Sequence, residues 1–126
     1  PQPAGFMAVM SDELTRESIH QAILDRRVYG TTGARIALHL DVSDNHMGSI
    51  LSLSTPRSFR LGVEGTTSIE SIDLIRDGLV IEVAKPDGSS WEGELADTEG
   101  QGSHWYVLRV SQADGHRAWT SPIWFE

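Results

Sequence analysis

Three side chains near one turn have the chemistry to ligate a divalent metal ion: Asp41, Asp44 and His46, within the run DVSDNHMGSI. Carboxylate and imidazole groups ligate the metal ions of hydrolases, but a site needs further ligands converging on the same point. The run is also rich in Asp, Asn and Gly, which are the residues that turn a chain. Neither HExxH nor Gly-x-Ser-x-Gly accompanies it. The sequence therefore favours an ordinary turn at residues 43–48, with a small metal-binding enzyme as the weaker alternative.

Four tryptophans form a second candidate group, because a planar apolar ring suits the face of a sugar. They are Trp91, Trp105, Trp119 and Trp124. Sandwich domains more often use such rings to fill the core or cover its rim. Glu92 and Glu94 alternate along one predicted strand, whereas a glycosidase needs two carboxylates that face each other across a cleft. The residues alone favour a binding or structural module over an enzyme, and they imply no cofactor.

Composition limits the partners and the size of the fold. A chain of 126 residues fits one domain. The net charge of −8 disfavours a nucleic-acid partner, because such proteins concentrate Lys and Arg where phosphates lie. The chain has no run of about 18 apolar residues, the length that a membrane span needs. There is no cysteine, which excludes disulfides and leaves the compartment open. The first residue is Pro rather than Met, which suggests a piece of a longer polypeptide.

An N-terminal segment of residues 1–30 is predicted to contain one amphipathic helix, over about residues 15–27. Thr15 is a suitable N-cap, since its hydroxyl can accept an otherwise unpaired backbone N–H. Arg26 and Arg27 are expected in the last turn, where cations complement the helix dipole. A helix this short needs to dock its apolar face on another surface.

Beyond residue 30 the apolar period changes from helical to two, which predicts half-buried strands. The side chains assigned to the inner faces are Ile36, Leu38, Leu40, Val42, Phe59, Leu61, Val63, Ile72, Leu74, Tyr106, Leu108 and Val110. Asp-Gly pairs at residues 77–78, 87–88 and 114–115 indicate tight turns and predict antiparallel neighbours. Residues 31–126 are therefore predicted to form an immunoglobulin- or fibronectin-like antiparallel β-sandwich, so that the chain is mainly β with one preceding helix.

Several segments occur in a distinctive order: LTRESIHQAILDRRVYGTTGARI, HMGS, IESIDLIRDG and YVLRVSQADGHRAWTSPIWFE. Residues 26–33 and 119–124 are the most specific of them. In this order they resemble the C-terminal part of bacterial metal-dependent hydrolases of the PHP superfamily, in the carbaryl-hydrolase-like group, which often carries a domain of unknown function. The resemblance runs from about Gly5 to Glu126. It implies that the His and Asp metal ligands lie in an N-terminal β/α barrel outside this chain, so that Asp44 and His46 inherit no catalytic role.

The resemblance implies a non-catalytic accessory domain that packs against the catalytic barrel of the same protein. The expected contact residues lie at the junction of helix and sandwich: Arg26, Arg27, Tyr29, Thr31 and Thr32. Their hydrogen-bonding groups exceed the needs of a plain connector, although they also suit the end of a helix and the start of a strand. A stand-alone carbohydrate- or protein-binding module that uses the tryptophans is the main alternative. An exposed helix or junction would also allow two copies to associate.

Overall fold

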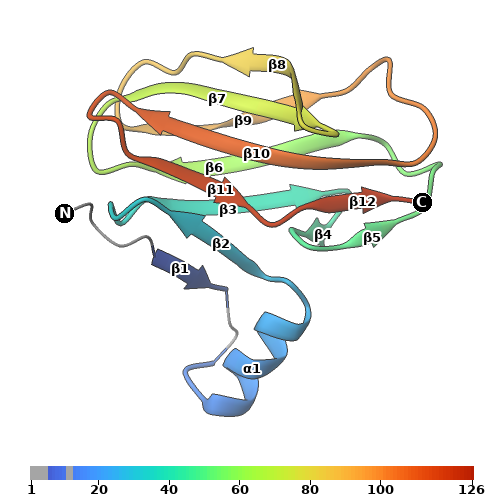
Figure 1. The fold of residues 1–126 in the computed structure, drawn as a ribbon, viewed down its shortest axis with the longest axis horizontal. Helices are drawn as coiled ribbons and strands as arrows, with labels where there is room; N and C mark the ends of the chain where they lie inside the picture. The colour runs from blue at the N-terminus through green and yellow to red at the C-terminus, as the bar shows by residue number, and fades with distance from the viewer. Residues whose placement is uncertain (1–5, 11–12) are drawn as a thin grey trace.

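A computed structural model describes residues 6–10 and 13–126. The described part contains one helix, α1 (Arg16–Leu24), and twelve strands in two layers (Figure 1). The strands are β1 (Phe6–Val9), β2 (Val28–Thr31), β3 (Ala37–Val42), β4 (Asn45–His46), β5 (Ile50–Leu51), β6 (Ser58–Glu64), β7 (Ile69–Arg76), β8 (Leu79–Ala84), β9 (Ser90–Ala96), β10 (His104–Gln112), β11 (Arg117–Thr120) and β12 (Ile123–Phe125). Within these residues, no helix is long and apolar enough to cross a membrane.

The larger layer, sheet A, has its described strands in the order β1-β2-β11-β10-β12-β5, with β7 on the other side of β10 and β8 beyond β7. The strands β11 and β12 pair with successive parts of β10. The smaller layer, sheet B, has the order β4-β3-β6-β9. Antiparallel pairs dominate both sheets, while β12 and β5 pair in parallel. The predicted mainly β sandwich with one helix is confirmed. The strand β2 crosses the boundary predicted between residues 30 and 31 and joins β1 to sheet A.

The core lies between the two sheets and contains the side chains that the period of two placed there. All twelve of the predicted inner-face side chains are at most 5% exposed. Three aromatic rings meet at one end of this core, with centroids of Phe59 and Tyr106 5.0 Å apart and those of Tyr106 and Phe125 5.4 Å apart. The alternation of apolar and polar residues predicts the buried side chains because successive side chains of a strand point to opposite faces of its sheet.

The helix is shorter than predicted. Thr15 is the N-cap, as expected, and its Oγ1 accepts a hydrogen bond from the backbone N–H of Ser18 at 3.1 Å. The helix ends at Leu24, however, and Arg26 has a left-handed backbone with φ 60°. Arg26 and Arg27 therefore lie outside the last turn, and the predicted dipole interaction is wrong. The chain turns at this point because it must enter β2, whose position is set by pairing with β1 and β11.

All three predicted Asp-Gly turns lie between strands. Two of them join antiparallel neighbours, as predicted, and the third does not. Residues 77–78 join β7 to β8 with φ values of 50° and 89°, as a two-residue hairpin of the type I′ class requires. Residues 114–115 lie between β10 and β11. Residues 87–88 connect β8 to β9, which belong to different sheets, so the prediction of antiparallel neighbours is wrong there. Residues 43–44, with φ values of 49° and 65°, close the β3–β4 hairpin.

Candidate functional site

Arg26 ties the end of α1 to the sandwich. Its Nε donates to the carbonyl oxygen of Gly48 at 2.7 Å, in the loop that precedes β5. Its guanidinium also lies 5.4 Å from the ring centroid of Trp124 on β12. A cation over the face of a tryptophan is attracted by the ring quadrupole. A single residue thus fixes the helix end to sheet A and to the loop beside it.

The other four predicted contact residues are divided between the core and the surface. Tyr29 packs against the core, and Thr31 is buried. Thr32 accepts a hydrogen bond from the first backbone N–H of β11 at 2.9 Å through its Oγ1. An Nη2 atom of Arg27 lies 3.7 Å from the carboxylate of Asp25. These contacts give Tyr29, Thr31 and Thr32 a role inside the sandwich, while a role of the set in packing against another domain stays a prediction.

Large apolar side chains are exposed on the elements that flank this junction. The exposed fractions are 60% for Met7, 96% for Leu14, 42% for Ile23 and 56% for Leu24. We call these four residues the N-terminal face. The helix packs on β1 and stands beside the two sheets rather than over either of them (Figure 1). These four side chains are candidates for an interaction surface, since contiguous exposed apolar area marks such sites.

Three of the four tryptophans are brought to the outer face of sheet A. Trp105 on β10 and Trp124 on β12 are paired in register, and Trp119 on β11 is paired with Arg109. Each ring has a buried neighbour along its strand, namely Tyr106, Ala118 and Ile123, so the pleat turns the rings outward, and Trp105 is 37% exposed. Trp91 lies on β9 of sheet B instead and packs partly against the core.

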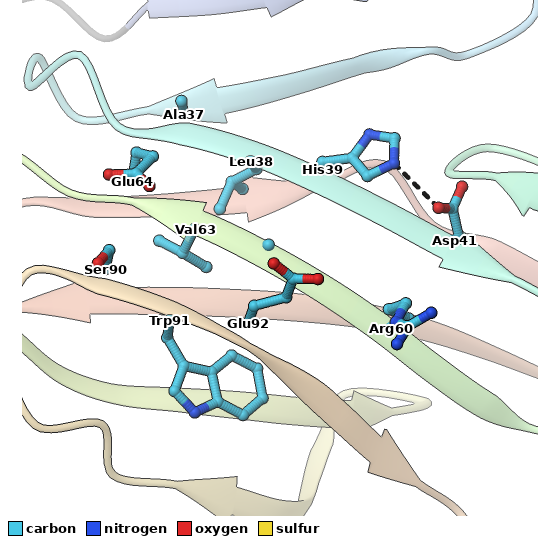
Figure 2. A pocket seen from close by; sticks show the side chains of 11 residues that line it. Ala37, Leu38, His39, Asp41, Arg60, Val63, Glu64, Ser90, Trp91 and Glu92 are labelled. Atoms are coloured by element: carbon cyan, nitrogen blue, oxygen red, sulfur yellow. Dashed lines mark hydrogen bonds and ion pairs between the residues drawn. The ribbon is translucent and has the colours of Figure 1, made fainter.

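The outer face of sheet B contains a hollow of about 670 Å³ (Figure 2). Gly62 forms its floor, because the register places this glycine between His39 of β3 and Glu92 of β9. The Nε2 atom of His39 lies 2.9 Å from the Oδ2 atom of Asp41 on one wall. Arg60 and the carboxylates along the wall give the mixed lining of the hollow charged groups that can exchange hydrogen bonds with a polar ligand.

Two of the three possible metal ligands at the β3–β4 turn, Asp41 and His46, have other partners. Asp41 faces His39, as described above, and the Nδ1 atom of His46 lies 2.7 Å from the carbonyl oxygen of Met47. Asp44 is exposed in the turn itself. Among residues 6–10 and 13–126, no group of three or more His, Cys, Asp or Glu side chains is arranged to hold a metal ion.

Sequence reasoning missed the contact of Arg26 with Gly48 and Trp124, and it missed the hollow over Gly62. Both depend on which strands are neighbours, and periodicity does not carry that information. The available signal was the glycines themselves, because a glycine inside or beside a strand often marks a close approach or an open space.

The chain is similar to a protein family and to three proteins for which no function is given. Residues 1–55 match the family described as "Protein of unknown function (DUF3604)". An uncharacterized protein of Chlamydia pneumoniae is 34% identical over 140 aligned positions, which cover 97% of this chain and 23% of the relative. Uncharacterized proteins of Chlamydia muridarum and Chlamydia trachomatis serovar D are 34% and 32% identical, with 22% of each covered. The chain thus spans less than a quarter of the length of these relatives. No solved structure matches it.

Proposed function

We propose that this chain is a non-catalytic accessory domain of a longer metal-dependent hydrolase of the PHP type. In this proposal the N-terminal face and the junction at Arg26 pack against the catalytic barrel of the same protein. The observation that carries the proposal is the exposure of four large apolar side chains on α1 and the elements beside it. The resemblance of residues 26–33 and 119–124 to the hydrolase group supplies the identity of the partner.

The energetics of the N-terminal face favour a covered state. Burying one large apolar side chain stabilises a structure by about 1.5–3 kcal/mol relative to leaving it in water. Leu14 and Leu24 are each more than half exposed in this chain. The greater length of the relatives leaves ample polypeptide to cover them. Arg26 and Arg27 at the junction would make the packing specific, because a guanidinium forms hydrogen bonds to a partner only in a defined geometry.

We expect the double change Ile23→Asp and Leu24→Asp to loosen the full-length protein. Placing two carboxylates in a buried contact should cost about 2 kcal/mol or more, and limited proteolysis should then cut more rapidly between the sandwich and the rest of the chain. The control is Leu79→Asp, since Leu79 is 71% exposed but lies at the β7–β8 turn. Equal responses of the two variants would contradict packing through the N-terminal face.

The hydrolase part of the proposal is tested separately, by the metal content of the same full-length protein. The full-length protein should contain a divalent metal by elemental analysis, because the catalytic barrel of this group holds its metals with His and Asp. A preparation that neither contains nor takes up metal would contradict the hydrolase assignment and leave the packing result unaffected.

The hollow on sheet B favours a second function, a binding module for small polyhydroxylated ligands such as oligosaccharides. Gly62→Val tests this idea, because a Cβ at Gly62 has the Cβ of His39 as its nearest neighbour at 4.0 Å, so there is space for a side chain that would occupy the floor of the hollow. The wild-type chain should bind at least one member of an oligosaccharide array, and the variant should bind none at an unchanged melting temperature. The hollow would be excluded as the site if the wild-type chain bound no oligosaccharide on the array, or if Gly62→Val still bound one.

A further inference from the structure

The outer face of sheet A carries a band of apolar side chains that crosses the sheet. Its members, which we call the tryptophan face, are Ile50, Trp124, Trp105, Val107, Ile75 and Val80. The register pairs Ile50 with Trp124 and Trp124 with Trp105, and it pairs Val107 with Ile75 and Ile75 with Val80. Ile50 is 55% exposed, Val80 47% and Trp105 37%. The band is therefore continuous from β5 to β8 and open to solvent.

Sheet B shows what a solvated face of this molecule is like. Its outward side chains on β3, β6 and β9 include His39, Asp41, Arg60, Glu64, Glu92 and Glu94. A sheet with one face in water normally alternates in this way, with apolar side chains inward and polar ones outward. The tryptophan face breaks the alternation on the other layer of the same sandwich. Exposed apolar area of this kind marks an interaction site.

The composition of the tryptophan face and its margin is that of a protein interface. Trp and Arg are the residues most enriched at the energetic centres of such interfaces. Arg26 lies over Trp124 at one margin. At another margin Arg109 donates from Nε and Nη2 to Oδ2 of Asp73, at 2.9 and 2.6 Å. Pairing of the charged groups before association lowers the cost of removing them from water.

The start of β10, which carries Trp105, is also held in place before any partner binds. The backbone N–H of Trp105 donates to Oδ1 of Asp77 at 3.0 Å, and the other carboxylate oxygen lies 2.5 Å from Nδ1 of His104. The hydrogen bond from the Trp105 backbone and the contact with His104 hold the pKa of Asp77 below its usual value. A surface that is ordered in advance loses less conformational entropy on binding.

We infer that the tryptophan face docks on another part of the same longer polypeptide. This inference rests on the proposed function and adds a second surface to it. The face is continuous with the junction, because Arg26 touches both, so that a partner seated on the junction reaches Trp124. In the relatives, more than three quarters of the length lies outside the matched region, which is enough polypeptide to form the partner surface.

Two other occupants fit the surface less well. A second copy would bring together two chains of net charge −8, and this repulsion opposes association. A sugar chain would stack on the rings of Trp105 and Trp124 but would leave the aliphatic half of the band, from Val107 to Val80, in water. A protein surface covers both halves.

The test uses the full-length protein with the double change Trp105→Lys and Val107→Lys. Proteolytic cleavage between the sandwich and the rest should become at least about tenfold faster, because two charges cannot be buried in a docked apolar face. Ile50→Lys, at a site that is 55% exposed, should act in the same direction without a folding defect. Glu92→Lys, on the outer face of sheet B, is the control and should leave the rate unchanged.

The outcomes separate this inference from the proposed function. If the tryptophan-face variants leave cleavage unchanged while Ile23→Asp with Leu24→Asp accelerates it, the inference is overturned and the proposed function stands. If neither set has an effect, both are overturned. A dimer of the full-length protein in sedimentation that Ile50→Lys dissociates would assign the face to a second copy instead. Oligosaccharide binding that Trp105→Lys with Val107→Lys abolishes would assign the face to a sugar.

Discussion

Replacing Gly48 by alanine is expected to lower the free energy of unfolding by about 3 kcal/mol or more. Gly48 has φ 85°, a conformation that side chains disfavour. A Cβ at this position would also overlap the Cβ and the carbonyl oxygen of Arg26. Because the obstacle includes backbone, it cannot rotate away, and the end of α1 would have to move from the sandwich.

The matched control for this prediction is Gly78→Ala. Gly78 has φ 89°, and a Cβ there would have no neighbour within 4 Å. Both variants therefore carry the same conformational penalty, of about 1 kcal/mol or more, and differ in the steric term. Chemical denaturation of the two variants measures the difference. Equal midpoints would show that Arg26 does not pack against Gly48 in solution.

Replacing Asp97 by alanine is expected to cost about 3 kcal/mol. The Asp97 side chain is 4% exposed, and its Oδ2 accepts from Tyr106 at 2.6 Å and from Arg76 at 2.8 Å. Arg57, itself buried, donates to the same tyrosine oxygen at 3.0 Å. Removing the carboxylate leaves two guanidinium groups around the tyrosine without the negative charge that they surround.

Because of the Asp97 carboxylate, we also expect the free energy of unfolding to fall at acidic pH. Burial raises the pKa of Asp97, but hydrogen bonds from Tyr106 and Arg76 outweigh this effect and hold the pKa below its usual value. A group with a lowered pKa in the folded state stabilises the fold above its unfolded pKa, about 3.9 for Asp. That contribution is lost as the pH falls from there through the folded pKa. Asp97→Ala should therefore flatten this part of the curve.

The control for the Asp97 variant is Glu70→Ala, which removes an exposed carboxylate from β7. Thermal unfolding between about pH 2 and pH 7 spans the acid range of both groups. The Glu70 variant should follow the wild-type curve within about 0.5 kcal/mol, as surface substitutions usually do. If Asp97→Ala shows the same stability as the wild type at every pH in this range, the network around Asp97 does not stabilise the protein.

Local chemistry explains why several elements were predictable. The N-cap at Thr15 depends on a hydroxyl and a backbone N–H three residues apart, and the hairpin at residues 77–78 depends on the freedom of Gly78 to adopt positive φ. Neither needs a distant partner. The helix end was not predictable, because Arg26 leaves the helix for a tertiary hydrogen bond to Gly48, 22 residues away.

The sequence by itself determined the strands, their inward faces and most of the turns, since an alternation such as Phe59, Leu61 and Val63 records burial on one side of a sheet. Only the tertiary structure decided which strands are neighbours. That choice places Trp105 beside Trp124 on one layer and leaves Gly62 between His39 and Glu92 on the other. The reason is physical: the pleat orients each side chain locally, whereas strand order depends on how all the apolar faces are buried together.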